Sequence, residues 1–263
     1  FTFGNTAKES YDRMINLVSI AERELKKYNN KIINNKKKFK KINFDINDSL
    51  FPILRKNLSE KNKDGSFTKW IFDFRVNDRI IKYLAHPKLK NFSCRGPVTP
   101  DHVIRTKSKP LILNLINIKK ENLDIFIKNE IKKYTTKYHK YYLKNKKYVR
   151  NTIELDPYPR LIFIPNFGIV AIGRSKKEAK IAGDLSEVAV DIISKAESLG
   201  KFVSIPDKEI FKVEYWPLEQ AKLKTLKRAP LTGNVTVISG GCGAIGLAIA
   251  KEFMNQGSEV VLL

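Results

Sequence analysis

Three glycines near the end of the sequence have the spacing of a turn that holds a phosphate group. Gly241, Gly243 and Gly246 form a G-x-G-x-x-G pattern, with a β-rich apolar run over 234–239 before it and an amphipathic helical pattern after it. In such a turn, glycine lets the chain reverse tightly, lets the main chain approach a pyrophosphate and lets the helix pack close to the strand. The first turn of the helix would add free N–H groups and a partial positive charge. Residues 231–263 therefore predict the first strand, helix and strand of a truncated Rossmann domain that binds NAD(P).

The same segment resembles the beginning of short-chain dehydrogenases, which carry Thr-Gly, three residues and then Gly-Ile-Gly. Here Ser239 replaces the threonine and keeps a hydroxyl, and Ala244 replaces the second glycine. The acidic residue for the ribose belongs about 20 residues past the glycines, and the family's Tyr-x-x-x-Lys pair lies farther on. We therefore expect no catalytic residue and no complete hydride chemistry within this chain. The resemblance implies NAD or NADP as the cofactor, with its diphosphate contacted by Ser239, Gly240, Gly243, Ile245 and Gly246.

The charged residues are strongly unbalanced. The chain has 50 Lys and Arg against 27 Asp and Glu, a formal net charge of +23. Clustered lysines would favour nucleic acid through counterion release, so a noncatalytic basic nucleic-acid-binding protein is the alternative function. However, the lysines are spread along the whole chain, which favours a solvated surface over a specific polyanion partner. We therefore do not expect a nucleic-acid partner.

The cysteines and the hydropathy of the sequence indicate the cellular compartment of the protein. Cys94 and Cys242 lie in different segments without a CxxC pattern, so neither a disulfide framework nor a cysteine metal site is predicted. The longest apolar stretch, 161–173, is interrupted by Pro165 and is shorter than the ~20 residues of a membrane-spanning helix. We expect a cytoplasmic protein without a membrane partner.

Apolar periodicity and turn residues predict alternating helices and strands, that is, an α/β fold class. Thr6 and Glu9 have the spacing of a capping box at the start of the first helix, and the lysine-rich run 29–41 is predicted to be a loop or linker. Strands are predicted over 70–76, 111–115, 161–164 and 169–172. Helices are predicted over 5–30, 47–62, from Thr99-Pro100-Asp101 onward, and over 121–146, 175–199 and 218–227.

The helix over 121–146 interleaves aromatic residues with lysines. Such a pattern is compatible with base stacking. Spacing of three and four residues is also what a surface helix needs to pack on a core, and this interpretation is favoured. The predicted buried stripe consists of Leu123, Ile127, Ile131, Tyr134, Tyr138 and Tyr141.

Two segments at a constant offset of 169 look alike. Gly4 to Ser10 aligns with Gly173 to Ala179, and a predicted helix of similar length follows each. A shared pattern of this kind indicates a duplicated unit. Capping physics alone also favours a hydroxyl followed three residues later by glutamate, so independent convergence remains the competing explanation.

Four segments, in this order, resemble the bifunctional class II aldolase/short-chain dehydrogenases, a family that includes rhamnulose-1-phosphate aldolase/alcohol dehydrogenase fusions. The segments are 1–11, 95–107, 156–160 and 214–222. The resemblance covers nearly the whole chain and implies an internal piece of a longer protein. The implied units are 1–30 as the C-terminal end of a first aldolase-like unit, 31–65 as a linker and helix, 66–230 as a second, degenerate aldolase-like unit with a connector, and 231–263 as the truncated Rossmann domain.

The same resemblance implies a metal in the intact protein. Class II aldolases of this family use a histidine-bound divalent metal, usually zinc, to stabilise the enediolate formed when a carbon–carbon bond breaks. One such histidine is expected just before Phe1. In the second unit Phe167 stands at the corresponding place, and a phenyl ring cannot coordinate a metal. We therefore expect zinc in the intact protein, no ligands from this chain and a structural role for the second unit.

The three histidines have no metal-binding spacing. His86, His102 and His139 form neither HxH nor HxxxH, so no metal site is predicted. Two roles remain open for His102, which follows Thr-Pro-Asp: hydrogen bonding at a helix start, or contact with substrate or another domain. In the second case the accompanying phosphate ligands would be Arg95, Arg105 and Lys107.

The function predicted from the sequence is that of an incomplete piece of a bifunctional enzyme. The piece belongs to a sugar-phosphate aldolase and NAD(P)-dependent short-chain dehydrogenase of deoxysugar, rhamnose-type catabolism, whose partner is a small-molecule sugar phosphate or aldehyde. The sequence leaves open the sugar, NAD versus NADP, the metal and a homo-oligomeric state. Residues 231–263 are fewer than the ~40 that usually fold without further support. We expect this unit to be loosely attached and short of contacts at its sheet edges.

Overall fold

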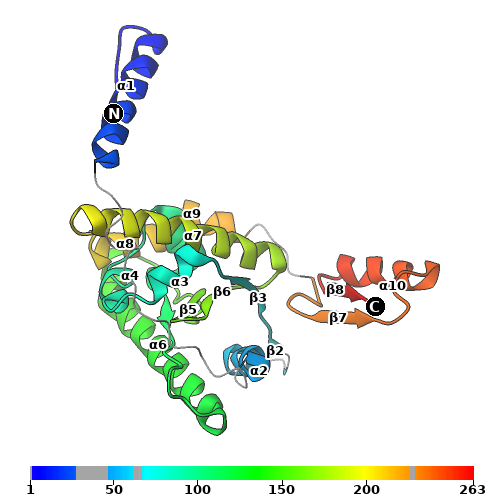
Figure 1. Ribbon diagram of the computed structural model, residues 1–263. Coiled ribbons are helices and arrows are strands. Elements are labelled where there is room, and N and C mark those ends of the chain that lie inside the picture. The colour runs from blue at the N-terminus through cyan, green and yellow to red at the C-terminus, as the bar shows by residue number, and fades with distance from the viewer. Residues whose placement is uncertain (1, 28–46, 62–64, 66, 225–228) are drawn as a thin grey trace.

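A four-stranded mixed sheet lies at the centre of the protein (Figure 1). The computed structural model describes residues 2–27, 47–61, 65, 67–224 and 229–263. The strand order is β3-β6-β5-β4, with β6 antiparallel to both of its neighbours and β4 parallel to β5. The bounds are β3 Ile71–Arg75, β4 Leu111–Ile112, β5 Leu161–Ile164 and β6 Gly168–Gly173. The predicted strands are therefore present, although β4 is shorter than the predicted 111–115.

Helices cover both faces of this sheet, which explains why the central strands β5 and β6 are apolar without alternation. In β5, Ile162 and Ile164 face one layer, and Leu161 and Phe163 face the other. The first layer contains α2 (Asn47–Leu58) and α6 (Leu123–Asn145), and the second contains α3 (Asp78–Leu84), α4 (Leu89–Ser93) and α7 (Lys176–Leu199). The α/β class predicted from the sequence is confirmed for this part of the chain.

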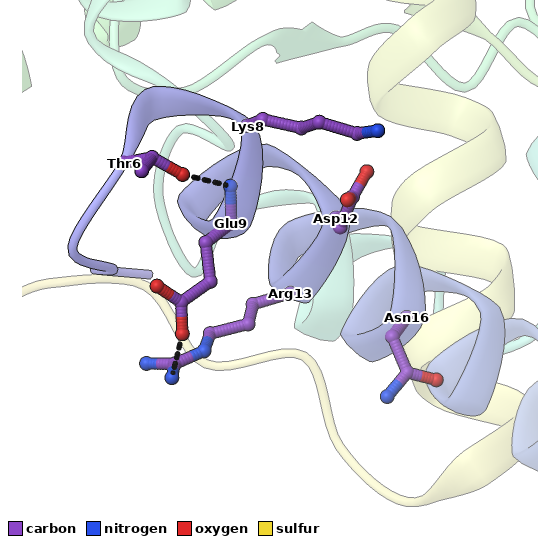
Figure 2. Close-up of a pocket in the computed structure, with 6 residues that line it drawn as sticks. All are labelled: Thr6, Lys8, Glu9, Asp12, Arg13 and Asn16. Carbon is purple, nitrogen blue, oxygen red and sulfur yellow. Dashed lines mark hydrogen bonds and ion pairs between the residues drawn. The ribbon is translucent and has the colours of Figure 1, made fainter.

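Two helices begin with the same hydrogen-bonded cap. At α1 (Ala7–Lys26), Glu9 N–H donates to the Thr6 hydroxyl at 3.1 Å, and Asn5 N–H donates to the Glu9 carboxylate at 2.8 Å. At α7, Glu178 N–H donates to Ser175 at 3.2 Å, and Arg174 N–H donates to Glu178 at 2.9 Å. Figure 2 shows the bond from Glu9 N–H to the Thr6 hydroxyl and the ion pair of the Glu9 carboxylate with Arg13. The sequence offset of 169 therefore corresponds to a repeated three-dimensional junction.

The two helices differ in burial. α7 packs on β6 and β3, whereas none of the residues of α1 is buried, and α1 lies apart from the sheet in Figure 1. The apolar residues that recur at helical spacing along α1 are exposed, from 45% at Ile15 to 58% at Tyr11, and include Val18 and Leu25. The predicted end of this helix at residue 30 and the predicted loop 29–41 lie outside the described residues.

The predicted aromatic stripe of α6 does pack into the protein. Leu123, Ile127, Ile131 and Tyr138 are buried, and Tyr134 and Tyr141 are partly buried. Core packing is therefore the role of this stripe, as the spacing favours.

Several predicted boundaries differ from those in the structure, which contains additional short elements. α2 ends at Leu58 instead of residue 62, because β1 (Glu60–Lys61) pairs there with β2 (Phe67–Thr68). Short 3-10 helices at Lys120–Asn122 and Lys146–Tyr148 flank α6. The connector contains α8 (Asp207–Glu214), which the sequence reasoning missed, before α9 (Pro217–Lys224). Its signal was present: Pro206 precedes the helix, and two acidic residues occupy its first turn.

The C-terminal unit forms a sheet of its own. β7 (Val235–Ile238), α10 (Ala244–Asn255) and β8 (Glu259–Leu262) form a β-α-β unit with β7 and β8 parallel. Hydrogen bonds join it to the rest of the protein: Arg55 Nη2 to Gly233 O, Lys69 Nζ to Asn234 Oδ1 and Lys176 N–H to Glu259 Oε1, each at 2.6 Å. Val235, Val237 and Val261 are 44–59% exposed, so part of this two-stranded sheet is uncovered.

Candidate functional site

The glycine turn between β7 and α10 is open and non-helical until Ala244. Gly240 has φ +66, a left-handed conformation in which glycine avoids the strain of a side chain. Gly243 N–H donates to Gly240 O at 3.1 Å, and Gly243 is the N-terminal cap of α10. These bonds reverse the chain directly after the strand, as the glycine pattern predicted.

Gly246 fixes the distance between the helix and the turn. A Cβ atom at this position would overlap Gly240 O and would lie 2.7 Å from the Gly241 Cα, closer than Cβ atoms come to their neighbours in real structures. Gly243 is different, because Gly240 O, at 3.4 Å, is the one described atom within 4 Å of its hypothetical Cβ. The turn therefore requires glycine at 246 for packing and leaves open space beside 243.

The predicted diphosphate ligands surround this open space. Ser239, Gly240, Gly243 and Ile245 are exposed, whereas Gly246 is buried. The Ile245 side chain is 78% exposed, so its contribution to the turn is its main chain. The N–H groups of the first helical turn have no acceptor within the helix, and Gly243 provides no capping side chain. This arrangement can accept an anion at the N-terminus of α10.

Replacing Gly246 with alanine is expected to destabilise the β-α-β unit by about 1–3 kcal/mol, because the added methyl group overpacks the turn. Hydrogen exchange of the amides in 231–263 would measure the loss of protection. Gly243→Ala is the matched control, since its methyl group fits the turn. Equal exchange in the two variants would contradict the packing role of Gly246.

A second candidate site is a buried group of ionisable side chains. The Lys107 ammonium lies 3.8 Å from the Glu214 carboxylate and 3.8 Å from the centre of the Tyr138 ring. Tyr138 donates its hydroxyl to Glu214 at 2.7 Å and lies 3.1 Å from the Tyr215 hydroxyl. Lys107, Glu214, Tyr138 and Tyr215 are at most 8% exposed. We call these four residues the Lys107 cluster.

Burial changes the protonation of this cluster. Burial lowers the pKa of Lys107 to about 8, although the negative charge of Glu214 acts in the opposite direction. Burial, followed by the charge of Glu214, raises the pKa of Tyr138 above its usual value. Lys107 also has φ +65 and ψ 168, a backbone region used almost entirely by glycine. A strained, buried lysine with a lowered pKa is typical of a site under functional or structural constraint.

Asp156 and Arg160 extend the cluster toward Trp70. Arg160 donates to the Asp156 carboxylate at 2.7 Å, and the guanidinium groups of Arg160 and Arg174 lie 4.5 and 3.8 Å from the centre of the Trp70 ring. Burial acts to raise the pKa of Asp156, but the charge and hydrogen bond of Arg160, together with the charge of Lys107 and the Tyr158 N–H, outweigh burial and lower the pKa. Three of the four sequence segments that carry the family resemblance, 95–107, 156–160 and 214–222, therefore meet at one buried place. The spacing of these residues in the sequence did not predict that the three segments meet.

The other residues of segment 95–107 have structural contacts. Arg95 is paired with Glu197 and donates to Phe202 O at 3.0 Å, so its proposed role as a phosphate ligand is not supported. Thr99 does not cap the backbone of α5 (Pro100–Thr106), and its hydroxyl instead lies 2.8 Å from His102 Nδ1. His102 Nε2 lies 2.9 Å from Leu185 O. Both ring nitrogens are thus engaged, Nδ1 at the start of α5 and Nε2 with a carbonyl of α7, which favours the first of the two roles considered for His102.

Comparison with known proteins places this fold in a family. A family model described as "Aldolase class II, second domain" matches residues 45–223, which include the whole four-stranded sheet. The chain belongs to the class II aldolase second-domain family. One relative of this aldolase-type chain is Uncharacterized oxidoreductase YuxG of Bacillus subtilis (strain 168), which is 29% identical over 272 residues. The alignment covers 99% of this chain and 38% of YuxG, so the chain spans well under half the length of the curated relative it matches. No solved structure matched the chain.

Within this class II aldolase second domain, Phe167 has a packing role. Its ring centre lies 4.9 Å from that of Phe74 and 6.2 Å from that of Phe51. Phe167 therefore belongs to an aromatic group between the β5–β6 turn, β3 and α2. No set of three or more His, Cys, Asp and Glu residues in the described ranges is placed to hold a metal ion. We assign no metal-dependent step to these residues.

None of the helices in the described ranges is both long enough and apolar enough to span a bilayer.

Proposed function

We propose that this chain is part of a bifunctional enzyme in which a class II aldolase-type unit is joined to an NAD(P)-dependent short-chain dehydrogenase. The substrate class would be a deoxysugar phosphate of the rhamnose type, or the aldehyde released from it. The alignment with a protein named as an oxidoreductase, over 99% of this chain, supports the redox part. The aldolase second-domain match supports the carbon–carbon lyase part.

The observation that supports the proposal is the open glycine turn at the N-terminus of α10, where an anion can be accepted. Gly243 caps α10, whose first-turn N–H groups have no acceptor within the helix, and a bulkier residue at 243 would fill the free space beside it. Four other residues complete the turn. Ser239 contributes a hydroxyl, and Gly240 contributes the left-handed bend. Ile245 contributes a main-chain amide, and Gly246 allows the close contact with the helix. NAD or NADP would supply hydride chemistry when bound.

The apolar surface of the C-terminal unit also supports a nucleotide-binding fold. Val235, Val237 and Val261 lie on one face of the two-stranded parallel sheet, opposite to Thr236 and Ile238. Parallel sheets are normally covered on both faces. A larger doubly wound sheet would bury these valines, which supports a Rossmann-type nucleotide-binding unit in residues 231–263.

The proposal is tested with the full chain and two closely matched variants. NAD⁺, NADP⁺ and ADP-ribose are titrated while the amide resonances of Ala244, Ile245 and Gly246 are followed by NMR. Gly243→Ala is expected to weaken binding of all three by about tenfold, because its methyl group blocks the approach of a phosphate to main-chain amides. Its unfolding midpoint should not change, since the methyl group fits the free turn.

Gly200→Ala is the control variant. It also adds a methyl group where no described atom lies within 4 Å, but it does so after α7, at the end of a different helix. Its nucleotide affinity should equal that of the original protein. Absence of nucleotide-dependent shifts, together with steeply salt-dependent retention on DNA, would contradict the proposal and favour the basic nucleic-acid-binding alternative.

A further inference from the structure

A large cavity lies along the free edge of the central sheet, away from the glycine turn. Its volume is about 830 Å³, within the usual range for small-molecule sites. It is enclosed by the α3–α4 segment, the edge strand β4, one side of α6 and the tip of the β5–β6 hairpin. The proposed dinucleotide function does not use any of these elements.

The wall of the cavity is apolar and is held in place by hydrogen bonds. Leu89 and Ile112 contribute aliphatic surface, and Tyr134 and Tyr138 contribute aromatic surface. The Tyr134 hydroxyl donates to Lys109 O at 2.8 Å, and the Tyr138 hydroxyl donates to Glu214 at 2.7 Å. Because both hydroxyls are anchored, the two rings form a preorganised surface that loses little conformational entropy when a ligand binds.

The charge of the cavity is positive. Four lysines and two acids line it, and each acid is already paired: Glu130 with Lys133 at 2.6 Å and Asp207 with Lys109 at 3.3 Å. Lys90 and Lys137 form no ion pair with a carboxylate in the described ranges, and they come from different helices, α4 and α6. Two unneutralised ammonium groups beside an apolar wall complement a ligand with an anionic head and an apolar body.

The positive charges of several of these lysines act together on the thiol of Cys94. Burial raises the pKa of this thiol, while the positive charges of Lys109, Lys90 and Lys137 act in the opposite direction. Three lysines that are separated in sequence therefore act on one point in the cavity wall.

We propose that this cavity binds a small organic anion, with its phosphate or carboxylate group paired with Lys90 and Lys137 and its apolar body packed on Tyr134, Tyr138 and Ile112. Such a ligand would bind to the class II aldolase second domain independently of any nucleotide on α10. The Lys107 cluster lies directly behind the cavity, because Tyr138 belongs to both. Occupancy of the cavity and the position of this ring are therefore coupled.

The test uses the full chain and four simple probes. Phenyl phosphate and benzoate carry the two anionic heads on the same body, and benzyl alcohol is their neutral counterpart. Binding is followed through the methyl resonances of Ile112 and Ile116, which line the cavity, with the 86% exposed Ile153 as a reference outside it. At least one of the anions is expected to shift Ile112 and Ile116 but not Ile153. Inorganic phosphate should bind more weakly than phenyl phosphate, because it lacks the apolar body.

Paired variants separate a specific site from general attraction to a basic protein. Lys90→Gln combined with Lys137→Gln is expected to weaken anion binding by about tenfold. Lys140→Gln combined with Lys144→Gln removes the same charge from exposed positions of α6 that do not line the cavity, and should leave the affinity unchanged. The proposal is overturned if neither anion binds, if benzyl alcohol binds as tightly as the anions, or if both pairs of substitutions have equal effects.

Discussion

Glu214→Gln is expected to lower the free energy of unfolding by about 3–5 kcal/mol at pH 7, the usual cost of removing one partner of a buried ion pair. Glutamine keeps the shape of the side chain and an acceptor for Tyr138, but it removes the charge that faces Lys107. The Lys107 ammonium then remains buried without its largest counter-charge. Urea denaturation followed by circular dichroism measures the change.

The loss of stability in Glu214→Gln should depend on pH, and the direction of this dependence identifies Lys107 as the residue that titrates. Its pKa is about 8 in the folded protein and 10.5 without burial, so between these values the unfolded chain binds more protons. Stability from this residue therefore rises as pH increases from about 8 toward 10, by roughly 2–3 kcal/mol. The Glu214→Gln penalty should shrink over the same window, because a neutral lysine needs no counter-charge.

Other residues titrate at higher pH with the opposite sign. Burial raises the pKa of Cys94 and of Tyr138, so in the folded state these groups keep protons that the unfolded chain releases. The free energy of unfolding is therefore measured for the original protein and for Lys107→Met at each pH, and the difference between the two is compared. Glu209→Gln, on the exposed side of the same helix, is the control and should not change the midpoint. If Glu214→Gln behaves like Glu209→Gln, or its penalty is independent of pH, the assigned role of Lys107 is wrong.

Trp70→Ala is the second substitution with a large expected effect, again about 3–5 kcal/mol. Trp70 is 1% exposed, its indole N–H donates to Leu58 O at 2.8 Å, and two guanidinium groups lie over its ring. The substitution removes a large core volume and leaves the last carbonyl of α2 without this donor. Guanidinium denaturation followed by circular dichroism avoids reliance on tryptophan emission.

Trp216 provides the matched comparison. It is the second of two tryptophans in the chain and is 50% exposed, so Trp216→Ala is expected to cost less than about 1 kcal/mol. Equal destabilisation by the two substitutions would show that the Trp70 contacts contribute nothing beyond the loss of an aromatic side chain.

Local chemistry made several features predictable from the sequence. The capping residues Thr6 and Glu9 act within one turn of helix, and the strands on either side of Pro165 are adjacent in the chain, so short-range patterns were sufficient. The glycine turn was predictable for the same reason. Its ligand could not be derived from geometry alone, and the proposal of NAD or NADP rests on family resemblance and on relatives.

Long-range features could not be predicted. Lys107, Asp156 and Glu214 lie far apart in sequence, and their proximity depends on the way α6 and α8 pack together. The positive φ of Lys107 contradicts the usual preference of lysine, which only tertiary contacts can override. The cavity likewise arises from four elements that have no common sequence signal. α1 is a different case. Its amphipathic pattern correctly predicts a helix, but the pattern does not identify what covers the exposed apolar side of that helix.

The pairing of β3 with β6 has a consequence for synthesis on the ribosome. Ile71 pairs with Gly173, so roughly 100 residues separate the two strands, and such distant pairings fold slowly. At the usual ~5–20 residues per second, β3 waits roughly 5–20 seconds for its partner to be translated. During that interval the apolar side chains of α2 and β3 are available to chaperones, and the nascent chain becomes committed to its native topology only when the β5–β6 hairpin has emerged.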